Sequence, residues 1–241
     1  SKGYVTTGYN PDQKYLSDTW EYNPETNSWR QMDDFKGGAR YYALGFGIDN
    51  YGYVGTGYND NYLKDFYRFD PTAAAGSQWT IVNGFGGQKR QGGTAFVIDG
   101  KAYVCGGQNN NSDVSDFWCF DPSAATPWTQ LRDIANTSDD DYDDDYTSIV
   151  RSYGVSFVID GKAYLTLGST AGGSYYSNYW IYDPATDLWE GDDLTAFEGS
   201  TRIHAVCFST GTRGIVATGG SGSSSYFDDA WELKPYEYEE E

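Results

Sequence analysis

The hydrophobic residues of this chain fall in short runs rich in Tyr, Phe, Trp, Val and Ile, and Gly, Asp-Pro or Asp-Gly turn signals separate the runs. Aromatic and β-branched runs between such turn signals are typical of antiparallel strands joined by hairpins. No stretch keeps a helical period. The pattern therefore predicts an all-β protein.

One pattern recurs five times along the chain. Each copy has aromatic or apolar residues at alternate positions just before a proline, at Pro24, Pro71, Pro122, Pro184 and Pro235. These prolines are 47, 51, 62 and 51 residues apart. A full copy predicts four strands, named a to d here, and in the second copy they start near Arg40, Tyr53, Phe66 and Trp79. Internal repeats of this length indicate an array of similar small sheets.

The units resemble kelch repeats, in which a strand ending in Gly-Gly precedes a Tyr- or Trp-bearing strand and then a further Trp. The resemblance implies a β-propeller with one four-stranded blade per repeat. It covers nearly the whole chain, and the stretch Gly52–Tyr58 resembles kelch-like surface proteins of Bacteroidetes. The Gly doublet is complete at Gly106-Gly107 and Gly219-Gly220. In the other copies its first Gly is replaced, and we expect the backbone to approach its neighbours differently there.

The first copy lacks strand a and the last copy lacks strand d, so 18 strands are expected where a closed five-bladed ring has 20. We favour five blades, with a natural N-terminus upstream of Ser1 that closes the ring. Six or seven blades are the alternative if the chain is truncated. The chain is interpreted as one propeller domain, 1–235, with repeats at about 1–32, 33–82, 83–131, 150–190 and 201–235, an acidic inserted loop at 132–149 and an acidic tail at 236–241.

Charge narrows the classes of partner. The net charge is −19, which opposes binding to phosphate backbones, so no nucleic-acid partner is expected. No apolar run approaches the roughly 18 residues of a membrane span, although a lipid anchor upstream of Ser1 stays open. Three cysteines, Cys105, Cys119 and Cys207, cannot build a disulfide framework and are expected to be small buried apolar residues.

The innermost strand of a propeller blade is strand a, so the b–c and d–a loops share one rim and the a–b and c–d turns share the other. The first rim carries the loops that vary in length, where binding sites usually lie. Four arginines open strand a on that rim: Arg40, Arg90, Arg151 and Arg202. They form either a cationic ring for a carboxylate or structural contacts to loop carbonyls and acids. Their repetition in register favours the structural interpretation.

Tyrosines mark the same rim. The b–c loops carry several of them, including Tyr58, Tyr62, Tyr175 and Tyr176. Four further rings follow the arginine positions and line the channel mouth or pack between blades: Tyr41, Tyr42, Tyr153 and His204. Tyrosine faces flanked by amides and carboxylates suit a sugar ring or a protein partner.

The segment Asp139–Asp145 lengthens one repeat and carries six Asp. Because Ca²⁺ binds carboxylates, Asp139, Asp141, Asp143 and Asp145 are weak candidate metal ligands. The segment fails the EF-hand pattern, since position twelve from Asp139 is Val150. A flexible, self-repelling loop is the preferred interpretation, and no metal or other cofactor is expected.

The leading hypothesis is a non-catalytic binding or scaffold propeller that presents a Tyr/Asn-rich loop face to a protein or glycan, in an extracellular, outer-membrane surface or periplasmic setting. The alternative is a sugar mutarotase or epimerase acting at the channel mouth, since the repeats also resemble those of sialic acid mutarotases. Galactose oxidase resembles this fold too, but its copper needs two His and this chain has one. No acid–base pair stands out, so an enzyme is the less favoured class.

Overall fold

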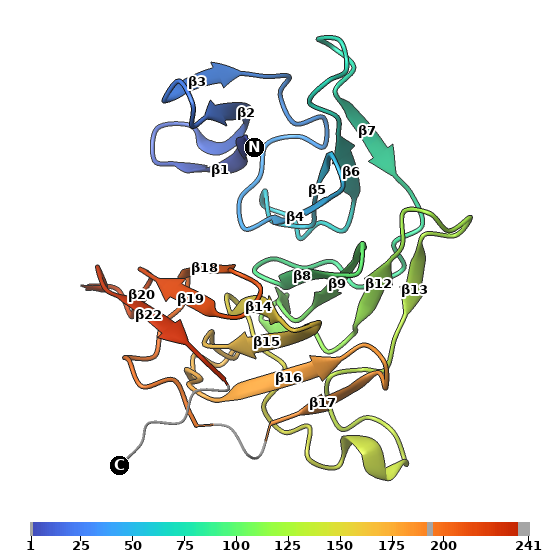
Figure 1. Ribbon diagram of the computed structural model, residues 1–241, viewed down its shortest axis with the longest axis vertical. Helices are drawn as coiled ribbons and strands as arrows, with labels where there is room; N and C mark the ends of the chain where they lie inside the picture. The colour runs from blue at the N-terminus through green and yellow to red at the C-terminus, as the bar shows by residue number, and fades with distance from the viewer. Residues whose placement is uncertain (1, 192–194, 236–241) are drawn as a thin grey trace.

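The computed structural model describes residues 2–191 and 195–235, and the acidic tail predicted at 236–241 lies outside them. Its secondary structure in that part is β-strand apart from one short 3₁₀ turn, Asp141–Asp143. Five small antiparallel sheets follow in chain order as the blades of a propeller (Figure 1). The predicted all-β propeller class is therefore confirmed.

The blades contain the strands that the repeat predicts. Blade 1 consists of β1 (Gly3–Asn10), β2 (Lys14–Asn23) and β3 (Ser28–Gln31). Blade 2 consists of β4 (Leu44–Ile48), β5 (Tyr51–Gly55), β6 (Phe66–Phe69) and β7 (Trp79–Val82). Blade 3 consists of β8 (Thr94–Ile98), β9 (Lys101–Cys105), β12 (Trp118–Phe120) and β13 (Trp128–Gln130).

Blade 4 consists of β14 (Val155–Ile159), β15 (Lys162–Thr166), β16 (Tyr179–Asp183) and β17 (Leu188–Glu190), and blade 5 of β18 (Val206–Ser209), β19 (Gly214–Ala217) and β22 (Ala230–Leu233). Two b–c loops add small ribbons, β10 (Gln108–Asn109) with β11 (Ser112–Asp113), and β20 (Gly220–Ser221) with β21 (Ser225–Tyr226). In the described residues blade 1 has no strand a and blade 5 no strand d, as the sequence predicts. The inner strands β4, β8, β14 and β18 contact one another in that order.

Aromatic side chains fill the space between complete blades. Phe96 on β8 stacks on Tyr103 of β9, with ring centroids 5.3 Å apart, and Tyr182 of blade 4 packs 5.3 Å from Tyr103. All three belong to one buried cluster that joins blades 3 and 4. Burial of large rings is the main apolar contribution to stability here. The many aromatic residues of the chain therefore serve to pack one blade on the next.

The incomplete blades leave apolar side chains exposed. Tyr4 on β1 occupies the position that Tyr53 holds in blade 2, yet it is 40% exposed whereas Tyr53 is 4% exposed. A groove of about 870 Å³ runs between β1 and the facing side of blade 2. At the other end, Phe208 on β18 is 57% exposed, whereas Phe157 at the same position of blade 4 is 3% exposed. Burial thus depends on a complete blade at Tyr4, which lacks the strand a residue that covers Tyr53, and on a following blade at Phe208.

The Gly doublet behaves differently from the sequence prediction. Strand pairing places Gly219, and not Gly220, at the position of Gly107, so only blade 3 has two glycines there. The first position nevertheless has a positive φ in every blade, at Thr7, Thr56, Gly106, Leu167 and Thr218. The backbone conformation is thus the same with and without Gly, but the approach of the neighbouring blade differs as expected, because a Cβ at Gly106 would lie 2.5 Å from the carbonyl oxygen of Arg151. The second position needs Gly, because a Cβ at Gly107 would lie 2.7 Å from a carbonyl oxygen.

The inserted loop 132–149 is anchored more firmly than a solvated loop. Ile134, Tyr146 and Ile149 are buried in the cluster between blades 3 and 4, and the hydroxyl of Tyr146 accepts a hydrogen bond of 2.8 Å from the Trp189 N–H. The carboxylate of Asp143 is fully buried and accepts the N–H groups of the loop itself. Within the acidic segment, the prediction of a flexible, self-repelling loop is wrong for Asp143.

The three cysteines are free thiols, as the sequence predicts. Cys105 is fully buried, and Cys119 and Cys207 are partly buried. Burial raises the pKa of the Cys105 thiol to about 12, so this group is an inert apolar residue at neutral pH.

The Asp-Pro turns are held by their own side chains. A carboxylate oxygen of Asp70, Asp121 and Asp183 accepts the backbone N–H two residues later, and Asn23 does the same with its amide oxygen in blade 1. The hydrogen bond from the Ser123 hydroxyl, more than any other contact, lowers the pKa of Asp121 to about 2. The Thr72 hydroxyl and the Lys162 ammonium likewise lower the pKa values of Asp70 and Asp183.

We expect these turns to make the stability of the fold sensitive to acid. Because the three carboxylates have lower pKa values folded than unfolded, the stability they add is complete above about pH 4 and is lost as the pH falls towards 2. The triple variant Asp70→Asn, Asp121→Asn, Asp183→Asn keeps the acceptor oxygens but cannot titrate. Urea unfolding between pH 4.5 and 2.5 should therefore show a shallower loss of stability for the variant. Asn23→Asp should steepen the loss, and equal slopes in all three proteins would contradict the assignment.

Candidate functional site

The four repeated arginines are buried inside their blades. Each guanidinium side chain is at most 1% exposed. Arg40 uses all five of its N–H donors, two on the Asp65 carboxylate and three on the carbonyl oxygens of Gly37, Gly38 and Thr56. Arg202 likewise bonds both oxygens of Asp229, and Arg90 bonds one oxygen of Asp116. This geometry favours the structural interpretation of these arginines over a cationic ring for a ligand.

Blade 4 departs from the other blades at this position. Arg151 meets the amide of Asn178 where the others meet a carboxylate, and its remaining donors bond carbonyl oxygens of Ser148, Ile149 and Leu167. The ring of Tyr176 lies 4.7 Å below the guanidinium. Burial without a nearby acid lowers the pKa of Arg151 to about 10. The carbonyls of Ser148 and Ile149 bond Arg151 as those of Gly37 and Gly38 bond Arg40, so blade 4 differs in the missing carboxylate.

The arginines position the residues that follow them. The carbonyl of Arg40, Arg90, Arg151 and Arg202 accepts a hydrogen bond from a glycine N–H of the preceding blade, at 2.8 to 3.0 Å. Two residues later the backbone is left-handed in each of these blades, at Tyr42 (φ 53°), Gly92 (φ 61°), Tyr153 (φ 58°) and His204 (φ 59°). Such a conformation is unfavourable for a residue with a large side chain. The repeat imposes this left-handed backbone, and it turns the rings of Tyr42, Tyr153 and His204 towards the channel mouth.

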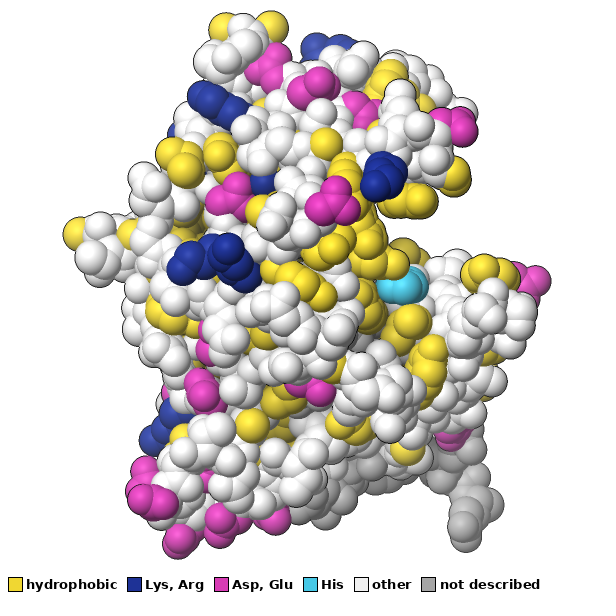
Figure 2. All heavy atoms as spheres, turned by 180° about the vertical axis from the view of Figure 1, so that it is seen from behind, with side chains coloured by type: hydrophobic (Ala, Val, Ile, Leu, Met, Phe, Trp, Pro, Cys, Tyr) yellow, Lys and Arg dark blue, Asp and Glu magenta, His cyan; other side chains and the backbone are white. Residues whose placement is uncertain are grey.

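These three rings contact one another across the mouth. Tyr42 of blade 2 stacks on His204 of blade 5, with centroids 5.0 Å apart and an angle of 8° between the rings. Tyr153 of blade 4 meets both rings edge to face, at 4.9 Å from Tyr42 and 4.6 Å from His204. Blade 3 contributes Gly92, where a Cβ would collide with the ring of Tyr153. Figure 2 shows the single His, in cyan, at the edge of a hollow beside apolar side chains.

Polar contacts fix the rings. The hydroxyl of Tyr153 accepts hydrogen bonds from the side-chain amides of Gln91 (2.8 Å) and Gln108 (2.7 Å). Partial burial raises the pKa of Tyr153 to about 12, so this hydroxyl keeps its proton. Because both amides donate to the oxygen, the hydroxyl hydrogen can be donated to an acceptor on a bound molecule. Packing against the two tyrosines lowers the pKa of His204, so the imidazole is neutral at pH 7.

The aromatic surface continues from Tyr42 into blades 1 and 2. Tyr41 lies 4.4 Å from Tyr42 and contacts three more tyrosine rings from the b–c loops, and a fourth ring follows beyond them. We call this continuous set the rim cluster: Tyr9, Tyr15, Tyr41, Tyr42, Tyr58, Tyr62, Tyr153 and His204. The hydroxyl of Tyr15 donates a 2.7 Å hydrogen bond to Asp60, which joins blades 1 and 2 at this rim.

The rim cluster contains some of the residues predicted from sequence and not others. Tyr58, Tyr62 and His204 belong to it. Tyr175 and Tyr176 do not, because Tyr176 packs under Arg151 and the Tyr175 hydroxyl accepts the Gly222 N–H at 2.9 Å. Sequence reasoning missed Gln91 and Gln108, and the only available signal was that they adjoin the arginine and the Gly doublet of blade 3.

The rim cluster can stack on flat or apolar groups and form a few directional hydrogen bonds. In the part of the chain that the structure describes, no three His, Cys, Asp or Glu side chains gather as a metal site. Of the candidate metal ligands, Asp139, Asp141 and Asp145 are exposed, whereas Asp143 is turned inward onto its own loop. Residues 2–191 and 195–235 also contain no helix long and apolar enough to span a membrane.

Known proteins resemble the chain at two levels. Residues 1–140 match the family described as the KLHDC2/KLHL20/DRC7 Kelch-repeats domain. Over 189 residues the chain is 25% identical to Kelch-like protein 15 of Danio rerio, and the match covers 74% of this chain and 30% of that protein. The chain thus spans under a third of the length of this relative.

A solved structure, titled "Structure of YjhT", is similar with a TM-score of 0.76 and 14% sequence identity, covering 98% of this chain and 79% of that one. At this identity the likeness supports the fold alone.

Proposed function

The chain belongs to the kelch-repeat family, and from that premise we propose that it is a non-catalytic binding module whose rim cluster holds a segment of a partner protein. The family supports a binding or scaffold role in general. The observation that carries the proposal is the left-handed backbone at Tyr42, Tyr153 and His204. The repeat imposes this backbone, and Gly92 shows that glycine fits it without strain, so an aromatic ring at three of the four positions indicates a task for the side chain, as strained residues at functional sites do.

The chemistry of the rim cluster favours a polypeptide segment. Tyrosine rings give large, rigid contact areas with little loss of side-chain freedom, and they are enriched at the centres of protein interfaces. The Tyr153 hydroxyl, held by two amides, suits a backbone carbonyl of the partner. The net charge of −19 attracts basic segments, whose cations also pack on tyrosine faces. An extracellular or cell-envelope setting is part of the proposal.

The test uses a displayed library of random peptides, selected on the wild-type protein. We expect Tyr42→Ala or Tyr153→Ala to weaken selected peptides by at least about tenfold, as removal of an interface hot spot does. Tyr226→Ala is the matched control, because Tyr226 lies outside the rim cluster and is 82% exposed. Selected peptides whose binding is unchanged by both cluster substitutions would refute the proposal.

A glycan is the second candidate ligand, because tyrosine faces also stack on sugar rings. A glycan array probed with the same variants distinguishes it from a peptide. The catalytic alternative, sugar mutarotation, is tested by NMR of anomer exchange with a panel of hexoses and sialic acid. Exchange above the uncatalysed rate that falls in Tyr153→Ala would replace the binding proposal by an enzymatic one.

A further inference from the structure

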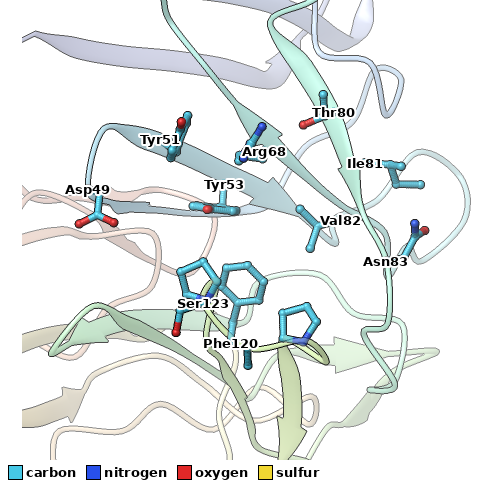
Figure 3. Close-up of a pocket in the computed structure, with 13 residues that line it drawn as sticks. Asp49, Tyr51, Tyr53, Arg68, Thr80, Ile81, Val82, Asn83, Phe120 and Ser123 are labelled. Atoms are coloured by element: carbon cyan, nitrogen blue, oxygen red, sulfur yellow. The ribbon is translucent and has the colours of Figure 1, made fainter.

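A second pocket lies between blades 2 and 3, on the rim opposite the rim cluster (Figure 3). It has a volume of about 650 Å³, within the usual range of small-ligand sites. The β4–β5 turn, at Asp49, and the turn after β12, at Pro122, both line it. The a–b and c–d turns therefore share this rim, as the sequence predicts. A ligand in this pocket would touch no residue of the rim cluster, so its binding does not depend on the proposed function.

The pocket contains a cation, Arg68, that forms no close ion pair with a carboxylate of the described residues. Arg68 on β6 occupies a repeat position that is Glu21 in blade 1 and Glu232 in blade 5, and each of these acids pairs with a basic side chain. Among the described residues no carboxylate lies within 4.0 Å of the Arg68 nitrogens. Its Nε is buried and has no hydrogen-bond partner.

Arg68 is nevertheless held in place. The guanidinium lies 4.5 Å from the centre of the Tyr51 ring. In Figure 3, Arg68 and Tyr51 lie at one end of the pocket and Phe120 lies at the other. A buried N–H without an acceptor is unfavourable, and a carboxylate beside this guanidinium would supply both the acceptor and a matching charge.

The rest of the pocket is largely apolar. Phe120, Pro122 and Pro127 of blade 3 form one wall. Val82 of β7, on the same face of blade 2 as Arg68, lies on the other side, so an apolar group bound between them would remove apolar surface from water. The Asp49 carboxylate also lines the pocket and disfavours a doubly charged anion such as phosphate.

We propose that this pocket binds a monocarboxylate joined to an apolar or aromatic group. The carboxylate completes the hydrogen bonding of Arg68, and the apolar group packs against Phe120 and the two prolines. A guanidinium matches a carboxylate in geometry as well as in charge. The carboxylate belongs either to a small molecule or to an acidic residue next to an apolar one in a peptide.

The test is NMR titration of ¹⁵N-labelled protein with four probes: 3-phenylpropionate, its uncharged amide, phenyl phosphate, and a blocked Phe-Glu dipeptide. We expect 3-phenylpropionate to shift the signals of residues that line the pocket, and the amide and the phosphate to bind at least about tenfold more weakly. Dipeptide binding that is tighter than that of phenylpropionate identifies a peptide source, and the reverse order identifies a small molecule.

Substitutions of Arg68 test whether its guanidinium binds the carboxylate of the probe. Arg68→Gln should weaken 3-phenylpropionate by at least about tenfold, and Arg68→Lys by less. Arg213→Gln is the control, because Arg213 already pairs with Glu232 in blade 5. The proposal would be overturned if the acid and the amide bound equally well, or if Arg68→Gln left the binding unchanged. It would also be overturned if 10 mM 3-phenylpropionate (about the weakest binding of interest) shifted no NMR signal of a residue that lines the pocket. If Arg68→Gln does not fold, the acid-to-amide comparison on the wild type decides.

Discussion

Replacing Phe157 by alanine is expected to lower the free energy of unfolding by about 3–5 kcal/mol, the usual cost of emptying a buried Phe site. Phe157 on β14 stacks on Tyr164 of β15, with ring centroids 6.0 Å apart, and is 3% exposed. Its ring also lies against Gly214 of blade 5, where a Cβ would collide with it. The cavity left by alanine would therefore lie between two blades, where the backbone cannot collapse to fill it.

The repeat provides the control for this substitution. Phe208 holds the same position in blade 5, but it is 57% exposed. Phe208→Ala is therefore expected to change the free energy of unfolding by about 0.5 kcal/mol or less, as surface substitutions do. Urea unfolding of both variants, followed by tryptophan fluorescence, measures the difference. Equal losses would show that Phe208 is covered in solution and that the exposed face of β18 is an interface.

The buried arginines predict an effect of similar size. Asp116→Ala removes the carboxylate bonded to Arg90, which is fully buried, and an unpaired buried cation costs about 3–5 kcal/mol. Asp116 also accepts the Gln88 N–H at 2.7 Å, so the d–a loop loses a contact in addition. Asp116→Asn reproduces the arrangement of blade 4 and should cost less than Asp116→Ala, because an amide still bonds the guanidinium.

In blade 4 we expect a substitution to raise the free energy of unfolding. Asn178→Asp supplies Arg151 with the carboxylate that the other blades have, and the Ser148 hydroxyl can donate to it. The substitution is expected to raise the free energy of unfolding by on the order of 1 kcal/mol, because it compensates a buried charge. Thermal and urea unfolding of Asp116→Ala, Asp116→Asn and Asn178→Asp measure the series. A destabilised Asn178→Asp would mean that the inserted loop already satisfies Arg151.

Much of the architecture could be predicted because every copy of the repeat shows the same pattern of strands and turns. The strand order within blades and the assignment of turns to the two rims agree with the structure. Within residues 2–191 and 195–235, so does the absence of strand a from the first copy and of strand d from the last. The structural role of the arginines could also be predicted from the sequence. In three repeats an Asp follows the Arg by 25 to 27 positions, and a pair that repeats in register indicates a contact within the blade.

Other features could not be predicted from local pattern. Thr7, Thr56, Leu167 and Thr218 adopt a left-handed backbone, although Thr and Leu side chains disfavour it. The register of Gly219 required strand pairing, since the adjacent Gly220 fits the sequence pattern equally well. Tyr146 and Ile149 are buried although they adjoin an acidic run, because the gap between blades 3 and 4 accommodates them.

The sequence by itself determined the repeat, the strands and the side of the sheet on which each aromatic lies, because these depend on neighbours along the chain and in the next strand. Only the tertiary structure decided which side chains from different blades meet. The stacking of Tyr42 on His204, and the position of Arg68 without an acid, depend on how successive blades are spaced and turned. That geometry is set by the packing of whole sheets, to which every blade contributes.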